Sequence, residues 1–300
     1  MGGYDTFPAV FDLVIAGEAF DDFIFYALDA LPTSGQELKT RAFAQAPGGG
    51  AVITAVAAAR LGVRAAVLSG LSGGAARALR RERVAVRNLR RRDELPAITV
   101  ALSTRRDRAF VTFNGVNDVL PRRIRRQLPR VRARHVHFAF HPVPCRPWVP
   151  VITRLRQRGV TTSWDFGWNP GLARDADFRR LVAGLDYLFL NREEALIYAR
   201  RRTLTGALDR WRESPHFVIL KLGPRGSRIV GGGTDLTAAA PRVRVRDTTG
   251  AGDAFNAGFL AARLLGRDLR QSLRLGNRLG ALSARRPGGI AGLPPRGRLP

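Results

Sequence analysis

The chain has 300 residues, 45% of them hydrophobic, which is ample for the core of one large α/β domain or of two smaller ones. No apolar run approaches the roughly 20 residues that span a bilayer, and the N-terminal MGGYDTFPAVFD carries acids where a secretory signal would carry basic residues. We therefore expect a cytoplasmic protein with no membrane segment. The single cysteine, Cys145, excludes an intramolecular disulfide and a cysteine metal cluster.

The formal net charge is +26 and comes almost entirely from arginine, since Lys39 and Lys221 are the only lysines. The arginines are spread along the chain and are densest at 80–92 and 122–134. A nucleic-acid binder would more often show a compact basic face with interleaved aromatic residues. We therefore predict no specific nucleic-acid partner, only weak and sequence-independent affinity for polyanions at low salt.

The first part of the chain alternates between strand and helix patterns. The short apolar run 12–16 predicts a buried first strand, and 18–22 follow at its carboxyl end, where open α/β sheets bind ligands. Residues 47–62 contain a glycine triplet and then an alanine-rich segment that ends in glycine, which predicts a tight turn into a helix. Residues 64–70 predict a second strand of the same sheet, and 75–83 a short helix behind it.

The alternation continues to the C-terminal region. Apolar β-formers at 97–102 and 108–113 flank the polar turn 103–107 and predict a hairpin. From Pro287 onward, glycines, prolines and arginines predict a loose tail over 287–300. Further strands are predicted at 135–140, 160–165, 187–190 and 217–222, and further helices at 147–158 and 273–285. This pattern predicts a mainly parallel sheet with helices on both faces.

The segment 246–265 carries the chemistry. Gly250, Ala251 and Gly252 precede Asp253, and apolar residues then recur at steps of three and four, which places the glycines at a helix N-terminus. Unpaired amides and the positive end of the helix dipole make such a place an anion site. A carboxylate there repels an anion unless it has a chemical task, and the task that fits is a general base for phosphoryl transfer. A helix cap is the alternative reading of Asp253.

The longer string DTTGAGDAFNAGF, residues 247–259, resembles the C-terminal signature of the ribokinase-like (PfkB) carbohydrate kinases. The resemblance extends from about Asp12 to about Gly289. It implies a single α/β domain over 1–300, a three-layer sandwich with a small β lid from about 18–46 and 96–118. It also implies that Asp253 is the catalytic base and that Gly250, Ala251 and Gly252 form the anion hole, for ATP-dependent phosphorylation of a hydroxyl group.

The same resemblance implies positions that bind the substrate. Asp22, with Asp21 as the adjacent candidate, matches a family aspartate that binds sugar hydroxyls, and the paired glycines of the N-terminal signature match Gly48 and Gly49. Asn117 matches a GxN element near the substrate. Asp165 matches an aspartate that follows the corresponding strand.

For the nucleotide, the family NxxE element matches Asn191 and Glu194, which implies that they help to place Mg²⁺ and phosphate through water. These two residues also fit a helix capping box, and both roles are compatible. The further implied ATP contacts are Lys221, Gly223, Gly226, Thr249 and Asn277. The predicted cofactors are ATP and Mg²⁺, with a monovalent cation left open.

Two positions depart from the family pattern. Phe20 replaces a frequent polar residue, and Ile53 replaces an asparagine that often contacts substrate. A nucleoside or a modified sugar is therefore an alternative to a simple sugar. The competing class of function is a non-catalytic, kinase-like scaffold that binds nucleic acid through its arginines. A homodimer formed through the lid is also left open.

Overall fold

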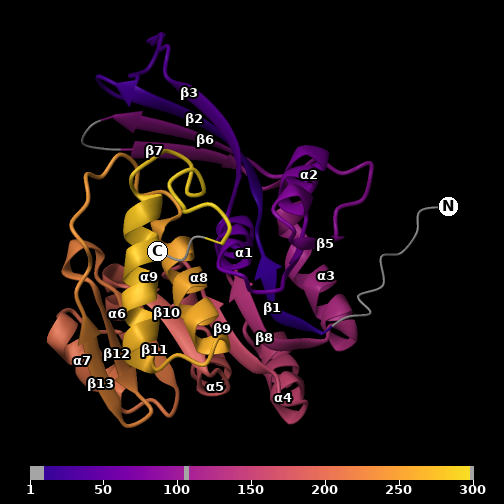
Figure 1. Cartoon of the computed structure of the whole chain (residues 1–300), viewed down its shortest axis with the longest axis vertical. Helices are drawn as coiled ribbons and strands as arrows, with labels where there is room; N and C mark the ends of the chain where they lie inside the picture. Colours follow the sequence, from indigo (N-terminus) through magenta and orange to yellow (C-terminus); the bar gives the residue numbers. More distant parts are fainter. Residues whose placement is uncertain (1–9, 105–107, 298–300) are drawn as a thin grey trace.

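A computed structural model describes residues 10–104 and 108–297. Its largest feature is a nine-stranded sheet with the strand order β13-β12-β11-β10-β9-β8-β1-β4-β5 (Figure 1). Neighbouring strands from β11 to β5 are parallel. The edge strand β13 is antiparallel to β12, and β12 is antiparallel to β11. The strands are β1 (Phe11–Gly17), β4 (Ala65–Ser69), β5 (Ala85–Asn88), β8 (Ala133–Ala139), β9 (Thr161–Asp165), β10 (Tyr187–Asn191), β11 (Phe217–Lys221), β12 (Ser227–Gly231) and β13 (Thr234–Ala238).

A second, four-stranded sheet extends beyond the end of the large one at the top of the view (Figure 1). It has the order β3-β2-β6-β7, from β2 (Phe20–Leu28), β3 (Phe43–Gly48), β6 (Ile98–Thr104) and β7 (Arg108–Phe113). The predicted hairpin is present as β6 and β7, and most of its polar turn, 105–107, lies outside the described residues. Because β2 begins three residues after β1 ends, the small sheet stands directly above the carboxyl end of β1.

Helices cover both faces of the large sheet, which confirms the three-layer prediction. On β1, Leu13 and Ile15 face one hydrophobic core while Val14 and Ala16 face the other, because successive side chains of a strand point to opposite sides. The first core contains α1 (Gly50–Arg60), α2 (Gly73–Arg81), α8 (Ala251–Leu264) and α9 (Leu269–Ser283). The second contains α3 (Leu120–Gln127), α4 (Val149–Gln157), α5 (Phe178–Ala183), α6 (Arg192–Ala199) and α7 (Leu204–Arg212).

Two predictions near the C-terminus need correction. Helix α9 begins at Leu269, four residues before the predicted start, because Asp268 and Gln271 form a capping box that apolar periodicity does not reveal. The tail predicted to be loose over 287–300 is ordered at 287–297, and 298–300 lie outside the described residues. Ser283 Oγ donates to the carbonyl of Gly289 at 2.7 Å, and Leu293 is buried. Hydrogen bonds from Arg60 to the carbonyls of Ile290 and Leu293 hold the segment against α1.

None of the helices in residues 10–104 and 108–297 combines the length and the apolar composition that a membrane span needs.

An aromatic cluster fills the second core. Trp164, on β9, is fully buried, stacks on Phe138 with ring centroids 4.3 Å apart, and meets Trp148 edge to face at 5.2 Å. Its indole nitrogen donates to the carbonyl of Phe140 at 2.7 Å. Trp168, only four residues later, is 56% exposed and offers a matched control.

We expect Trp164→Ala to lower the free energy of unfolding by about 3–5 kcal/mol, because it creates a large cavity and leaves a buried carbonyl without its donor. Trp168→Ala should change it by less than about 0.5 kcal/mol. Chemical denaturation of both variants tests this difference, and similar midpoints for the two would contradict the cluster's role.

Candidate active site

The site is organised by the start of α8. Gly250 is its N-terminal cap, with φ of 73°, a backbone conformation that favours glycine. The amide of Ala251 donates to the carbonyl of Thr248 at 3.2 Å, so it serves the loop rather than an outside anion. The amides of Gly252 and Asp253 have no acceptor among the described residues, as expected for the first turn of a helix. The number of amides available to an anion is thus smaller than the motif suggests, because the Ala251 amide already has an acceptor.

The carboxylate of Asp253 is partly buried and has no hydrogen-bond partner among residues 10–104 and 108–297. Its place is fixed through the backbone, because Thr54 Oγ1 donates to the Asp253 carbonyl at 3.3 Å. Burial, and next the charge of Asp165, raise the pKa of Asp253 to about 7, while the ammonium of Lys221 opposes this shift. A carboxyl group with a pKa near neutrality, and free of partners, is suited to take up a proton.

A glycine turn separates Asp253 from a second unpartnered carboxylate, that of Asp22 on β2. A Cβ added to Gly48 would lie 1.8 Å from Asp22 Oδ2, and one added to Gly50 would lie 3.0 Å from Asp253 Oδ1. The turn at the start of α1 therefore has to be made of glycine for both carboxylates to approach it. Burial, then the charges of Asp21, Asp247 and Asp253, raise the pKa of Asp22 to about 7. Both acids thus lie against the same glycine turn.

The other candidates near Asp22 differ in whether they offer a polar atom to a substrate. Asn117 is buried and donates from Nδ2 to the carbonyl of Ala19 at 3.2 Å, while its Oδ1 has no partner in the described structure. Asp21 instead accepts from Ser72 Oγ at 2.8 Å and points away from Asp22 on the other face of β2. Ile53 is buried between Gly250 and Gly289, so this position supplies no polar contact.

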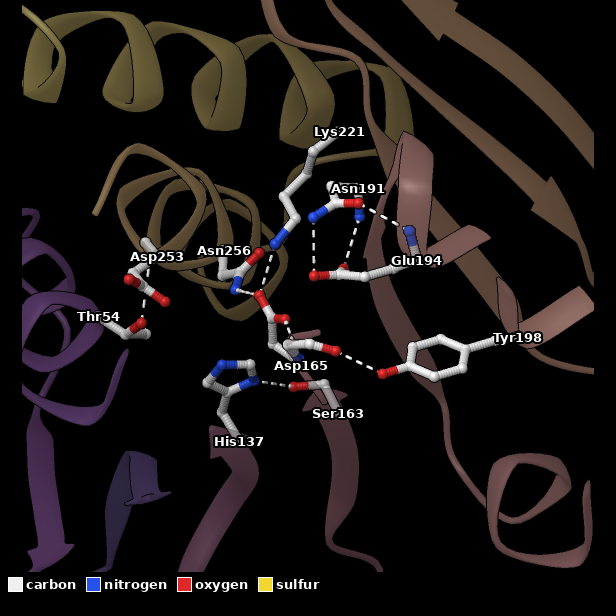
Figure 2. A network of polar contacts seen from close by, with 11 residues as sticks. Thr54, His137, Ser163, Asp165, Asn191, Glu194, Tyr198, Lys221, Asp253 and Asn256 are labelled. Atoms are coloured by element: carbon white, nitrogen blue, oxygen red, sulfur yellow. Dashed lines mark hydrogen bonds and ion pairs between the residues drawn. The ribbon is translucent and has the colours of Figure 1, made fainter. Parts of the chain in front are cut away.

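Asp165 and Lys221 form a largely buried ion pair at the ends of β9 and β11, at the centre of Figure 2. Lys221 Nζ lies 2.5 Å from Asp165 Oδ2, which also accepts from Asn256 Nδ2 at 2.6 Å. Although burial alone would raise it, Lys221 and Asn256 hold the pKa of Asp165 below its usual value. The Asp165 carboxylate is thus already bound by protein groups, which is at odds with the expected contact to substrate. Asp165 instead positions Lys221 and, through Asn256, α8.

Asn191 and Glu194 form the capping box that the sequence allowed (Figure 2). Glu194 accepts from the backbone and the side-chain nitrogen of Asn191 at 2.8 and 2.7 Å, and Asn191 Oδ1 accepts from the Glu194 amide at 2.8 Å. Burial, then the charge of Asp165, raise the pKa of Glu194 to about 7. Both carboxylate oxygens are occupied, so this pair fits a hydrated metal ion better than direct coordination. Among the described residues no cluster of three His, Cys, Asp or Glu side chains could hold a metal.

A cavity of about 470 Å³ opens beside the start of α8 and gathers six of the predicted nucleotide contacts and anion-hole residues. They are Lys221, Gly223, Gly226, Ala251, Gly252 and Asn277. Asn277 directs its amide nitrogen to the carbonyls of Ala238 and Ala239 at 2.9 and 3.2 Å, which leaves its oxygen for a ligand. Thr249 does not line the cavity, whereas Thr248 does, because the Thr249 amide turns to Asp247.

Sequence reasoning missed one wall of this cavity. Residues 240–243 and Val245, which follow β13, supply a mainly apolar surface, and Phe255, Ala281 and Ala284 complete it from α8 and α9. This segment matches no motif, so the sequence did not indicate that it lines a cavity, although it lies between a strand and the signature at 247–259. The cavity has the size of a nucleotide site, with apolar walls at one end and amides and an ammonium at the other.

Residues 10–296 match the pfkB family of carbohydrate kinases. The chain is 26% identical to the ribokinase of Bacillus subtilis over 285 residues, which cover 90% of this chain and 92% of that protein. It is 30% identical to the 2-dehydro-3-deoxygluconokinase of the same organism, with 57% of this chain and 52% of that one covered. The chain thus spans about half the length of some curated relatives and nearly all of another.

Solved structures share the fold. The ribokinase of Cryptococcus neoformans in complex with ADP has a TM-score of 0.78 at 19% identity, covering 96% of this chain and 97% of that one. An E. coli protein solved with ATP and Mg²⁺ has a TM-score of 0.77 at 21% identity, covering 95% and 96%. These matches confirm both the resemblance and the predicted architecture. The chain belongs to the pfkB family of carbohydrate kinases.

Proposed function

We propose that this chain uses ATP to phosphorylate a hydroxyl group of a sugar or a sugar-like small molecule. The observation that carries this proposal is the pair of Asp22 and Asp253, two buried or partly buried carboxylates without hydrogen-bond partners among the described residues, on either side of one glycine turn. Carboxylate oxygens that no protein group uses are available to accept hydrogen bonds from the hydroxyl groups of a ligand. Family membership supports the same conclusion.

In the proposed mechanism Asp22 accepts hydrogen bonds from substrate hydroxyls, and this orients one hydroxyl toward Asp253. Asp253 takes the proton of that hydroxyl while the hydroxyl oxygen forms a bond to the γ-phosphorus of ATP. The bond between this phosphorus and the oxygen that leaves with ADP breaks at the same time. The amides of Gly252 and Asp253 stabilise the negative charge of the transferred group. Bound ATP supplies the phosphoryl group.

The cavity beside α8 is the proposed ATP site, with the apolar residues around Val243 and Val245 against the base and Lys221 near the phosphates. A Cβ added to Gly252 would lie 3.2 Å from Lys221 Nζ, so the ammonium stands at the start of α8. Asn191 and Glu194 would hold Mg²⁺ through water, where it would neutralise phosphate charge. A monovalent cation stays a prediction from the resemblance alone.

The small sheet is the proposed lid, and its closure would exclude water from the reaction. Its strands expose large apolar side chains, Phe43, Phe110, Val111 and Phe113, which favours the homodimer through this sheet. A requirement for ATP is consistent with a cytoplasmic location.

The substrate side offers Asp22 and Asn117, while Phe20 and Ile53 reduce its polarity. A nucleoside is therefore the second candidate substrate. A non-catalytic scaffold that binds nucleic acid is disfavoured because it would not need Asp253. Screening sugars and nucleosides for ATP-dependent phosphorylation identifies the substrate, and a consistent failure with every class would favour the scaffold.

With the substrate identified, Asp253→Asn should lower kcat by about 10²–10⁴-fold, because the amide cannot take the proton. Asp22→Asn should act mainly on the KM for the substrate, since it removes a binding contact. Asp21→Asn is the matched control and should change neither constant appreciably, because Asp21 contacts Ser72. Steady-state kinetics decide, and a kcat for Asp253→Asn within a few-fold of wild type would rule out this mechanism.

The pKa of about 7 for Asp253 also predicts a pH dependence. In the wild type, kcat/KM should rise with pH through about 7 as the base of the free enzyme loses its proton. Because this pKa lies above the ordinary value of 3.8, the stabilisation from the protonated group is lost as pH rises from about 4 to 7. Asp253→Asn should therefore melt at a higher temperature than wild type above pH 7, with the difference vanishing near pH 3. Equal melting temperatures at pH 8 would contradict the desolvated carboxylate.

Glu194→Gln should raise the Mg²⁺ concentration needed for half-maximal activity, because a neutral side chain attracts the hydrated cation less. The control is Glu193→Gln, which changes an exposed neighbour with the same charge. Magnesium titrations of activity distinguish the two. Overlapping titrations for wild type and Glu194→Gln would remove this residue from the metal site.

A further inference from the structure

A cavity of about 620 Å³ at the far edge of the large sheet is lined by six arginines. It lies where β5, the last strand of the sheet, meets α2 and α3, which stand together at the right of Figure 1. The arginines come from all of these elements and from the loop after β5: Arg80, Arg87, Arg90, Arg91, Arg123 and Arg126. None of the predicted kinase residues lines it.

Hydrogen bonds preorganise part of this arginine cavity. Arg90 donates to the carbonyls of Leu71 and Glu94 at 2.8 and 2.6 Å, which orients its guanidinium without neutralising the charge. Arg123 forms a two-pronged ion pair with Glu94, and Asp93 lies near enough to stabilise its charge. In the described structure no carboxylate lies within ion-pair distance of Arg80, Arg91 or Arg126. The positive charge therefore exceeds the nearby negative charge.

Local explanations account for single arginines but not for their convergence. Arg80 and Arg126 stand in the last turns of α2 and α3, where basic residues favour the helix dipole. Charged side chains such as Arg87 also protect an edge strand from pairing with another chain. Neither effect requires that the guanidinium groups share one cavity, where they repel one another within a Debye length. Bound anions would relieve that repulsion.

We propose that the arginine cavity binds a small ligand with two or more linked phosphate groups, at a site separate from the kinase centre. Guanidinium groups bind phosphate oxygens through paired, charge-assisted hydrogen bonds, and Arg80, Arg91 and Arg126 together exceed the need of a single phosphate. Gln127 and Asn88 add polar groups to the wall. The volume is that of a nucleotide-sized ligand rather than of an extended groove, which favours a small polyphosphate over nucleic acid.

The test uses inorganic tripolyphosphate, the full-length chain and isothermal titration calorimetry at physiological ionic strength. Arg80, Arg91 and Arg126 are replaced together by glutamine, because their side chains are exposed and make no hydrogen bond or ion pair with the described part of the chain. The matched control replaces Arg146, Arg154 and Arg180, three exposed arginines around another cavity, and removes the same charge. Wild type and control should give the same tripolyphosphate binding isotherm, with one site at the arginine cavity beside any site at the kinase centre.

The cavity variant should bind tripolyphosphate at one site fewer, or at that site at least about tenfold more weakly, because three charge-assisted contacts are lost. Equal weakening in both variants would overturn the proposal, since it would reflect net charge alone. So would an isotherm for the cavity variant that matches wild type. An oligonucleotide that binds through the same three arginines under conditions where tripolyphosphate does not would also overturn it, in favour of nucleic acid.

A second measurement on the unchanged protein covers the case in which the triple variant fails to fold. Phenylglyoxal modifies accessible arginines, and mass spectrometry locates the modified residues. Tripolyphosphate should protect Arg80, Arg91 and Arg126 several-fold, and leave Arg146, Arg154 and Arg180 unprotected. Uniform protection of all six, or none, would overturn the proposal.

Discussion

The ion pair between Asp165 and Lys221 connects the parts on which the rest of the site depends. It joins the carboxyl ends of β9 and β11, and Asn256 extends the connection to α8. Both charges are removed from water, so they are stable only as a pair with their additional hydrogen bonds. The pair thereby holds the start of α8 against the sheet edge, with a positive charge beside Gly252 and a negative charge that raises the pKa of Asp253.

This arrangement explains why the pKa values of the carboxyl groups near the pair differ so much. Asp165 is ionised because Lys221 compensates its charge, whereas Asp253, Asp22 and Glu194 are desolvated without full compensation and have raised pKa values. The free energy that it costs to bury these groups is offset by the packing of a large sheet with helices on both faces. A kinase site of this kind therefore uses part of the stability that the two hydrophobic cores provide.

Prediction from sequence was reliable where a local pattern has one structural meaning. Buried parallel strands read as short apolar runs, and the glycine turn before α1 and the helix after Gly250 follow from their residues. Capping was less visible, since Asp268 starts α9 before its apolar period begins. The segment 287–297 was misread because composition cannot register the hydrogen bonds that Arg60 makes to it.

The sequence by itself determined the fold class and the family and proposed Asp253 and Asp22 as the acids of the site, because these calls rest on contiguous residues. Only the tertiary structure decided what Asp165 and the apolar wall around Val243 do, and which arginines meet at the edge of the sheet. Their roles depend on partners 29 to 91 residues away in the chain, such as Asn256 for Asp165 and Glu94 for Arg123. Pairings over such separations are set by packing and charge in the folded protein, which no local pattern records.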